Sequence, residues 1–211
     1  MVDLKQISEF LIQGNRDQVR SLVEKALEEG VPAEDLIYKA LVPGMNVVGE
    51  RFKNNEFYVP EVLIAARAMQ AAMEILDPIV AEKGIKPVGT VAIGTVEGDL
   101  HDIGKNLVAM MLKGSGFKIM DLGVDVKPEQ FVQSVKDGAN VVALSALLTT
   151  TMPSMKKTIQ ALEAAGVRGS AKVIIGGAPL TDSYAREIGA DGYAPDAASA
   201  VDTARELLGV A

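Results

Sequence analysis

Apolar residues recur at helical spacing through the first 84 residues of the chain. The spacing is set in the opening stretch and returns in three later ones, Val19–Leu27, Leu36–Leu41 and Leu63–Leu76. Pro43-Gly44 should kink or split the third helix, because proline removes a backbone donor. The fourth helix is expected to begin near Pro60. This pattern predicts a small bundle of four amphipathic helices over residues 1–84.

From Val88 onward short apolar runs alternate with helical stretches. Five such units favour an α/β fold with a five-stranded parallel sheet covered on both faces, in which every strand ends at one edge. A polar linker at residues 83–87 separates this second domain, residues 88–211, from the helices. The predicted strands are Gly89–Val96, Phe117–Leu122, Asn140–Leu144, Lys172–Ile175 and a short one near Gly192-Tyr193.

Composition narrows the chemistry that this chain can support. Its 211 residues include no cysteine and one histidine, which excludes disulfides, thiolate metal sites and sites built from several imidazoles. A net charge of -7 argues against binding to nucleic acid. The polar N-terminus and the lack of a long apolar run predict a cytoplasmic protein without a membrane partner.

The single histidine, His101, directly follows the first predicted strand, and Asp99 precedes it by two residues. Ligands bind at this edge of an α/β sheet, and a carboxylate can fix the tautomer of a neighbouring imidazole. The pair suits one nitrogen ligand to a metal that its own cofactor otherwise holds. The alternative is structural, with Asp99 as a helix N-cap and His101 facing solvent.

Other predicted strand ends are also unusual. The hydroxyl-rich segment Ser145–Thr151 can cap the helix that begins at Pro153, line a pocket with the hydroxyls of Ser145 and Thr151, or do both, because a cap needs only one hydroxyl. Gly176-Gly177-Ala178 either forms a tight turn or lets the backbone approach a flat ligand. The chain contains no glycine-rich phosphate-binding motif, which leaves dinucleotide and triphosphate sites with little support.

Three motifs occur in order: Asp99-x-His101-x-x-Gly104, Ser145-x-Leu147 and Gly176-Gly177. Together with the helical segment Pro43–Leu63, they resemble the cobalamin-binding module of methionine synthase. They resemble more closely the small corrinoid proteins of methyltransferase systems that use methylamines, methanol, betaines or methoxylated aromatics. The resemblance implies a helical cap domain followed by a Rossmann-like, flavodoxin-like domain that binds cobalamin or a related corrinoid.

The resemblance also implies roles for individual residues. His101 would be the lower axial ligand of cobalt, and Asp99 and the Thr151 hydroxyl would complete its relay. Ser145 and Gly176-Gly177 would line the slot for the displaced nucleotide tail, and Tyr58 would lie over the methyl face. The full set of implied cofactor-binding residues is Gly98, Asp99, His101, Asp102, Ile103, Gly104, Ser145, Leu147, Thr149, Thr151, Gly176, Gly177, Ala178, Tyr193 and Tyr58.

The implied function is that of a methyl carrier in one-carbon metabolism, cycling between methylcobalamin and Co(I). A substrate-specific methyltransferase would supply the methyl group, and a second methyltransferase would pass it to tetrahydrofolate or another thiol or pterin acceptor. A reductive activation protein would serve the cycle, and the carrier would contribute no catalytic residue of its own. The alternatives are the cobalamin-binding subunit of an adenosylcobalamin-dependent mutase, a cobalamin-dependent light sensor or transcription factor, and a cobalamin-free interaction module.

Overall fold

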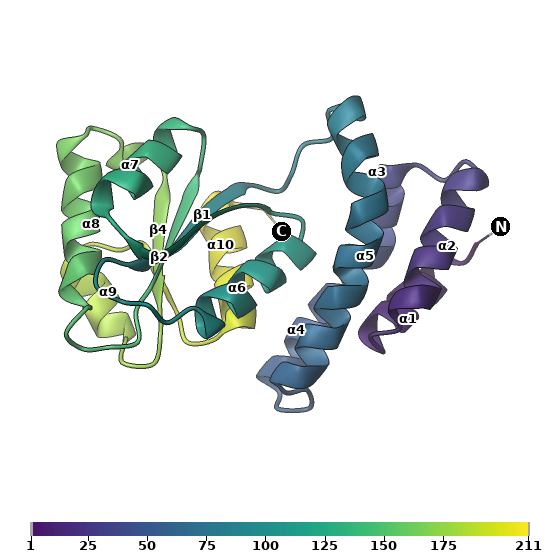
Figure 1. Ribbon diagram of the computed structural model, residues 1–211, viewed down its shortest axis with the longest axis horizontal. Coiled ribbons are helices and arrows are strands. Elements are labelled where there is room, and N and C mark those ends of the chain that lie inside the picture. Colours follow the sequence, from purple (N-terminus) through teal and green to yellow (C-terminus); the bar gives the residue numbers. More distant parts are fainter. Residues whose placement is uncertain (1, 211) are drawn as a thin grey trace. The chain divides into compact units, whose positions relative to one another are not determined.

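Two units divide the chain in the computed structural model, which describes residues 2–210 (Figure 1). The boundary lies between Pro87 and Val88, and the short segment Lys113–Gly116 groups with the first unit. This boundary falls at the end of the linker expected from the sequence.

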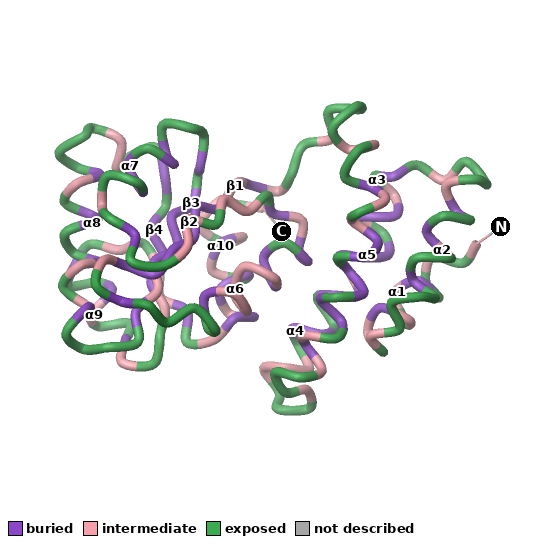
Figure 2. The backbone as a smooth tube through the Cα atoms, in the orientation of Figure 1, coloured by how far each residue is buried: buried purple, intermediate pink, exposed green. Residues whose placement is uncertain are grey.

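The first unit is built from helices α1 (Leu4–Ile12), α2 (Arg16–Glu28), α3 (Ala33–Leu36), α4 (Val42–Lys53) and α5 (Val59–Lys83). Asp3 and Asn15 cap α1 and α2 by accepting hydrogen bonds from backbone N–H groups of the first turn. The apolar positions at helical spacing are buried, among them Leu11, Val23 and Leu76. The alternation of buried and exposed positions along these helices is visible in Figure 2.

Pro43-Gly44 does not split the helix, so that part of the prediction is wrong. A π-helical turn, Ile37–Leu41, joins α3 to α4 without interruption, so the two helices and the turn form one helical run. The N–H of Val42 donates to the carbonyl of Ile37, five residues earlier. The π turn lies just before Pro43, which has no N–H and so cannot donate a helical hydrogen bond. A π turn at this point lets the helix continue past the missing bond.

The second unit contains one parallel sheet of strands β1 (Thr90–Val96), β2 (Lys118–Val126), β3 (Val141–Ser145), β4 (Lys172–Gly176) and β5 (Gly192–Ala194). Their order across the sheet is β2-β1-β3-β4-β5. This is the flavodoxin-like order, and it confirms the predicted fold class. The strand order reverses between β1 and β3, and the carboxyl ends of these two strands define the switch point where ligands bind in such sheets.

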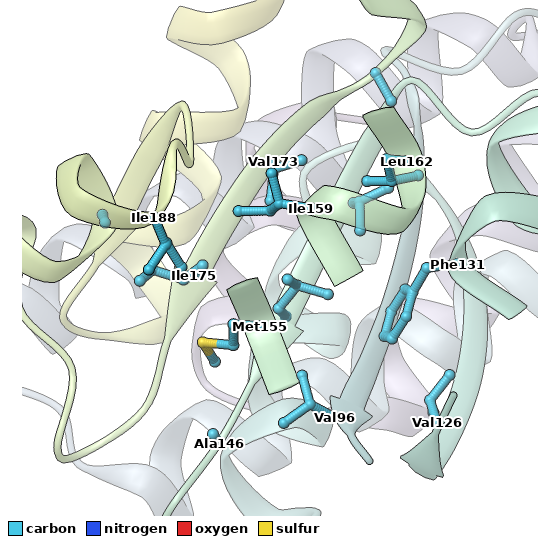
Figure 3. Close-up of a cluster of buried hydrophobic side chains, with 14 of the residues drawn as sticks. Val96, Val126, Phe131, Ala146, Met155, Ile159, Leu162, Val173, Ile175 and Ile188 are labelled. Atoms are coloured by element: carbon cyan, nitrogen blue, oxygen red, sulfur yellow. The ribbon is translucent and has the colours of Figure 1, made fainter. Parts of the chain in front are cut away.

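Five helices cover the sheet: α6 (Ile103–Gly114), α7 (Pro128–Lys136), α8 (Pro153–Ala164), α9 (Asp182–Ile188) and α10 (Ala197–Leu208). Helices α7, α8 and α9 lie on one face, where Phe131, Ile159 and Ile188 join a hydrophobic cluster with strand residues (Figure 3). Helices α6 and α10 lie on the other face (Figure 1). A short 3-10 helix, Arg168–Ser170, precedes β4. Within residues 2–210 no helix is both long and apolar enough to span a membrane.

Candidate functional site

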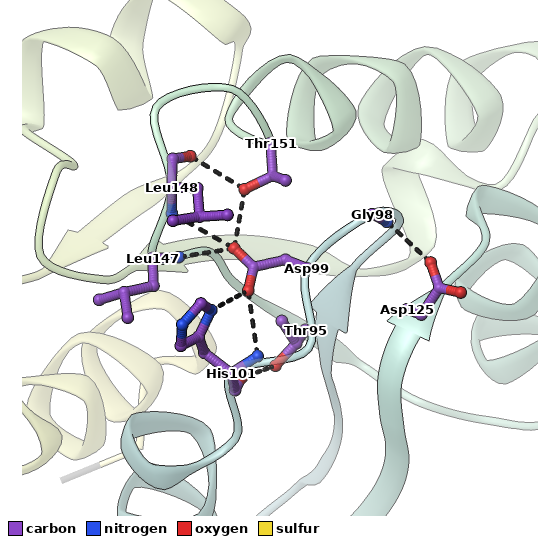
Figure 4. Close-up of polar contacts among 8 residues, drawn as sticks. All are labelled: Thr95, Gly98, Asp99, His101, Asp125, Leu147, Leu148 and Thr151. Atoms are coloured by element: carbon purple, nitrogen blue, oxygen red, sulfur yellow. Dashed lines mark hydrogen bonds and ion pairs between the residues drawn. The ribbon is translucent and has the colours of Figure 1, made fainter.

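Asp99 is the centre of a hydrogen-bond network in the loop between β1 and α6 (Figure 4). Its buried carboxylate accepts from the backbone N–H of His101 at 3.1 Å and lies 2.7 Å from His101 Nδ1, both through Oδ1. Its other oxygen, Oδ2, accepts from Leu147 N at 2.8 Å, Leu148 N at 3.3 Å and Thr151 Oγ1 at 2.7 Å. The carboxylate therefore links the loop after β1 to the segment after β3, at the switch point of the sheet.

This network keeps Asp99 ionised. Burial acts to raise the pKa of the carboxyl, but the hydrogen bonds from Leu147 N, Thr151 and His101 outweigh it and hold the pKa well below its usual value. The helix-cap alternative for Asp99 is wrong, because α6 begins only at Ile103 and the carboxylate is engaged elsewhere. The helix-cap alternative for Thr151 fails likewise, since its hydroxyl lies against Asp99 and Leu148 O, and α8 has no side-chain cap.

His101 is held in one orientation while part of its ring stays accessible. Thr95 Oγ1 donates to its carbonyl at 2.7 Å, and Asp99 accepts from its N–H, so both backbone groups are fixed. An ionised Asp99 accepts from Nδ1, which places the proton there and leaves the lone pair on Nε2. With 51% of the side chain exposed, Nε2 is a nitrogen donor available to a metal.

Three strand ends meet beside this loop. Thr95 of β1 pairs in register with Ser145 of β3, and Ser145 pairs with Gly176 of β4. Gly177 has φ of +136°, and a Cβ built on it would lie 1.9 Å from the carbonyl oxygen of Ala146. The second glycine is therefore required for close contact between two loops of the protein itself, which explains it without any ligand.

Aliphatic side chains surround His101 on both loops and remain exposed. Ile103 is 80% exposed and Leu100 is 71% exposed, although they lie on either side of His101, the single histidine of the chain. Leu147 and Leu148, whose backbone N–H groups bind Asp99, also expose their side chains. Exposed apolar side chains gathered on adjoining loops indicate a binding surface. A flat, largely apolar group with a metal at its centre would cover these side chains and meet Nε2.

Comparison with known proteins identifies the family of this chain. Two family models match the chain, both described as a B12 binding domain, one over residues 89–202 and the other over residues 3–77. The chain belongs to the B12-binding family. Both units of this B12-binding protein are therefore accounted for by the family, and its cofactor is a corrinoid that contains cobalt.

Relatives of this B12-binding protein match it along nearly its whole length. A corrinoid protein of Desulfitobacterium hafniense (strain Y51) is 41% identical over 210 residues, covering 98% of this chain and 97% of the relative. Dimethylamine corrinoid protein 2 of Methanosarcina acetivorans is 43% identical over 207 residues, covering 97% and 95%. The crystal structure of a methanol:cobalamin methyltransferase complex from Methanosarcina barkeri matches with a TM-score of 0.85 and 30% identity, covering 96% of this chain and 78% of that one.

The donor set of this B12-binding protein fits a corrinoid. A corrin ring already supplies the equatorial ligands of its cobalt, so one protein nitrogen with an open approach is the set that it needs. His101 would supply that nitrogen, and Asp99 lies 2.7 Å from Nδ1, where it orients the ring. A Cβ on Gly104, in the first turn of α6, would meet no atom within 4 Å, so the space beside this glycine is open.

The remaining predicted residues lie at five places in the fold. Gly98, Asp102, Ile103 and Gly104 lie on the His101 loop or the start of α6, and Ser145, Leu147, Thr149 and Thr151 lie at the end of β3 or after it. Gly176, Gly177 and Ala178 lie at the end of β4, and Tyr193 lies in β5 with its side chain packed against the hydrophobic cluster. Tyr58 belongs to the helical unit, where it precedes α5 and is 62% exposed.

The sequence analysis did not include Asp125 in the site. The second predicted strand ended at Leu122, but β2 continues to Val126 and contains Asp125. Asp125 Oδ1 accepts from Gly98 N at 2.7 Å, and Asp125 N donates to the carbonyl of Asp99 at 3.0 Å. The partners lie 27 residues apart, so no local pattern could have pointed to the contact.

Proposed function

We propose that this protein carries a methyl group on the cobalt of a corrinoid that His101 ligates through Nε2. The observation that carries the proposal is the Asp99–His101 pair, with Nδ1 held at 2.7 Å and the other side of the ring open among exposed aliphatic residues. The cobalt of the bound corrinoid supplies the chemistry, because it can accept a methyl group and give it up again.

The protein's own residues hold and tune the ligand. Asp99 accepts a hydrogen bond from Nδ1–H of His101, which fixes the tautomer and makes Nε2 a better electron-pair donor to a metal. Thr151 and the N–H groups of Leu147 and Leu148 hold the carboxylate in place, so the imidazole cannot turn freely. The remaining cofactor-binding residues expected from the sequence, from Gly98 to Tyr193, are proposed to contact the ring or its nucleotide tail.

A substrate-specific methyltransferase is the natural first partner, since relatives include dimethylamine corrinoid proteins and a chain in a methanol:cobalamin methyltransferase complex. We propose that a second methyltransferase passes the group to tetrahydrofolate or another thiol or pterin acceptor, and that a reductive activation protein restores oxidised cofactor. The mutase alternative is not favoured, because the relatives are corrinoid proteins of methyl metabolism and the helical unit is also a B12 binding domain. The helical unit is proposed to act as a movable cap, with Tyr58 toward the methyl face.

The ligand assignment can be tested with one isotope label. His101 is the chain's only histidine, so protein grown with ¹⁵N-histidine is labelled at one residue. Loaded with cob(II)alamin, its EPR spectrum should show the nitrogen splitting of the axial ligand change between ¹⁴N and ¹⁵N protein. The isotope effect should be absent in His101→Ala. Splitting that is insensitive to the label would mean that the cofactor's own base remains bound, and the assignment would be wrong.

The carrier role needs a separate measurement. The purified, loaded protein should not demethylate methylamines or methanol until a matching methyltransferase is added. Sustained turnover of a methyl donor by this chain alone would contradict the carrier role.

A further inference from the structure

Asp125 is held in an unfavourable backbone conformation beside the His101 loop. Its φ is +52°, in the left-handed region that residues other than glycine seldom adopt. Backbone strain of this kind persists where the surroundings enforce it, and it gathers at functional sites. The enforcing contacts are two reciprocal hydrogen bonds: Gly98 N donates to Asp125 Oδ1 at 2.7 Å, and Asp125 N donates to Asp99 O at 3.0 Å.

These bonds fix the turn from a different direction than the Asp99 network does. In Figure 4 Asp125 reaches the turn from β2, whereas Leu147, Leu148 and Thr151 reach Asp99 from the segment after β3. Without these two bonds, the backbone from Gly98 to Asp99 would lose its hydrogen bonds to β2 and keep only the bond from Asp99 N to Val96 O at 3.0 Å, within the turn itself.

We infer that Asp125 is a positioning residue for the cobalt ligand His101, an inference that rests on the proposed function. By fixing the N–H of Gly98 and the carbonyl of Asp99, it fixes the carboxylate that orients the imidazole. The corrinoid then meets an imidazole that is already oriented. If the loop sampled other conformations, the apparent affinity for the corrinoid would fall in proportion to the fraction of molecules whose imidazole is correctly oriented.

The chain supplies a matched control at the opposite edge of the sheet. There Thr90 N donates to Asn140 Oδ1 at 2.7 Å, and Asn140 N donates to Thr90 O at 3.0 Å. This pair joins the start of β1 to the start of β3 through one side-chain acceptor and one backbone donor, as Asp125 does, although both of its bonds go to a single residue. Asn140→Ala therefore removes an equivalent side-chain acceptor from the same unit without touching the His101 loop.

Two substitutions at Asp125 separate its side-chain acceptor from its backbone conformation. Asp125→Gly accepts a positive φ and keeps the backbone bond to Asp99, but removes the acceptor for Gly98. Asp125→Asn tolerates the same φ and keeps a side-chain oxygen, so it should act as the conservative rescue.

Three quantities are measured on the full chain: the Kd for cob(II)alamin, the ¹⁵N-histidine EPR signature of the loaded protein, and hydrogen exchange of the Gly98 amide without corrinoid. Loss of one solvent-exposed hydrogen bond predicts that Asp125→Gly raises the Kd about threefold to tenfold. It should also show a fraction of Co(II) without the histidine signature and faster exchange at Gly98. Asp125→Asn should stay within about twofold of the wild-type Kd, and Asn140→Ala should match wild type in the EPR signature.

An Asp125→Gly protein with wild-type affinity and a full histidine signature would overturn the inference, as would an equal loss in Asn140→Ala. Should Asp125→Gly fail to fold, the wild-type protein still decides, because a Gly98 amide that exchanges at the unprotected rate would show that the contact is not maintained. Failure of the proposed function looks different: the wild-type EPR splitting would be insensitive to the ¹⁵N label.

Discussion

Replacing Asp99 with asparagine should weaken histidine ligation by roughly tenfold while keeping the side-chain volume. The carboxylate accepts at both oxygens: Oδ1 faces His101 N and Nδ1, and Oδ2 faces Leu147 N, Leu148 N and the Thr151 hydroxyl. An amide can accept at only one of these two positions, because its NH₂ group is a donor. The orientation that the amide adopts therefore decides the tautomer of His101.

The network shows which orientation wins. With its oxygen toward Leu147 and Leu148, the amide satisfies both backbone donors and turns its NH₂ toward the imidazole, which can accept by moving its proton to Nε2. One backbone donor, His101 N, is then unsatisfied. The opposite orientation leaves two backbone donors facing the NH₂ group. A buried unsatisfied donor costs about 1–3 kcal/mol, so the first orientation should dominate by roughly tenfold.

In that orientation Nε2 carries the proton and has no lone pair for cobalt. The free energy of unfolding should also fall, by roughly 2–4 kcal/mol, because charge-assisted bonds are lost or weakened. With a single histidine in the chain, two-bond ¹H–¹⁵N spectra of ¹⁵N-histidine protein report the tautomer directly, without corrinoid. The wild type should show the Nδ1–H form, and Asp99→Asn mainly the Nε2–H form together with a smaller fraction of Co(II) that shows the ¹⁵N-sensitive EPR splitting.

Thr151→Val is the matched control, because it removes a donor to Asp99 but leaves the carboxylate and hence the tautomer unchanged. It should lower the free energy of unfolding by about 1–2 kcal/mol and keep histidine ligation. The reasoning is refuted if Asp99→Asn retains the Nδ1–H tautomer, or if it binds cobalt through His101 at wild-type occupancy.

Three further outcomes are expected. Gly104→Ala should raise the free energy of unfolding of the corrinoid-free protein by up to about 1 kcal/mol, because the added Cβ meets no atom within 4 Å, but it should weaken corrinoid binding. The control is Gly169→Ala, whose Cβ also meets no atom, and it should leave the titrated affinity for corrinoid unchanged. Asp121→Asn should lower that free energy by about 1–2 kcal/mol at pH 7, because Lys105 is buried and loses its carboxylate, with the effect discounted for the 47% exposure of Asp121. Burial raises the pKa of Asp121, but the hydrogen bonds from Lys105 and Gly123 N outweigh it and lower the pKa overall. In denaturation measured at several pH values, the stabilisation from Asp121 should therefore be full above the ordinary carboxyl pKa of about 4 and vanish as the pH falls through the lowered pKa. A difference between wild type and Asp121→Asn that does not depend on pH would contradict this. Tyr58→Ala should change stability by less than about 0.5 kcal/mol, because the ring is exposed, but should shorten the lifetime of the methylated protein in light and air; an equal lifetime would count against the cap.

The sequence was informative where the physics is local. Helical periodicity located the buried faces of α1, α2 and α5, and apolar runs located all five strands, because both depend on neighbours within a few residues. The order of the motifs brought the segments after β1, β3 and β4 to one edge, since parallel strands all end there. The implied corrinoid cofactor and the methyl-carrier family are confirmed by the relatives.

Features that depend on distant contacts could not be predicted. The helical run continues past Pro43 because a π turn accommodates the missing backbone donor. The spacing of apolar residues does not reveal this turn. The second glycine of Gly176-Gly177 was associated with ligand approach, but its close neighbour is the carbonyl of Ala146, on another loop. The assignments of individual residues to corrinoid contacts stay predictions.

The arrangement around Asp99 explains why the site needs residues from three strands. One carboxylate must accept five hydrogen bonds, and no single loop has enough donors pointing inward to provide them. The segment after β3 supplies three donors, His101 supplies two, and Asp125 of β2 fixes the backbone between them. The orientation of His101 is therefore set by contacts with both neighbours of β1 in the sheet. A movement of the segment after β3 would reach the imidazole through Asp99 Oδ2, so the ligand strength of Nε2 is coupled to the conformation of a loop that exposes Leu147 and Leu148.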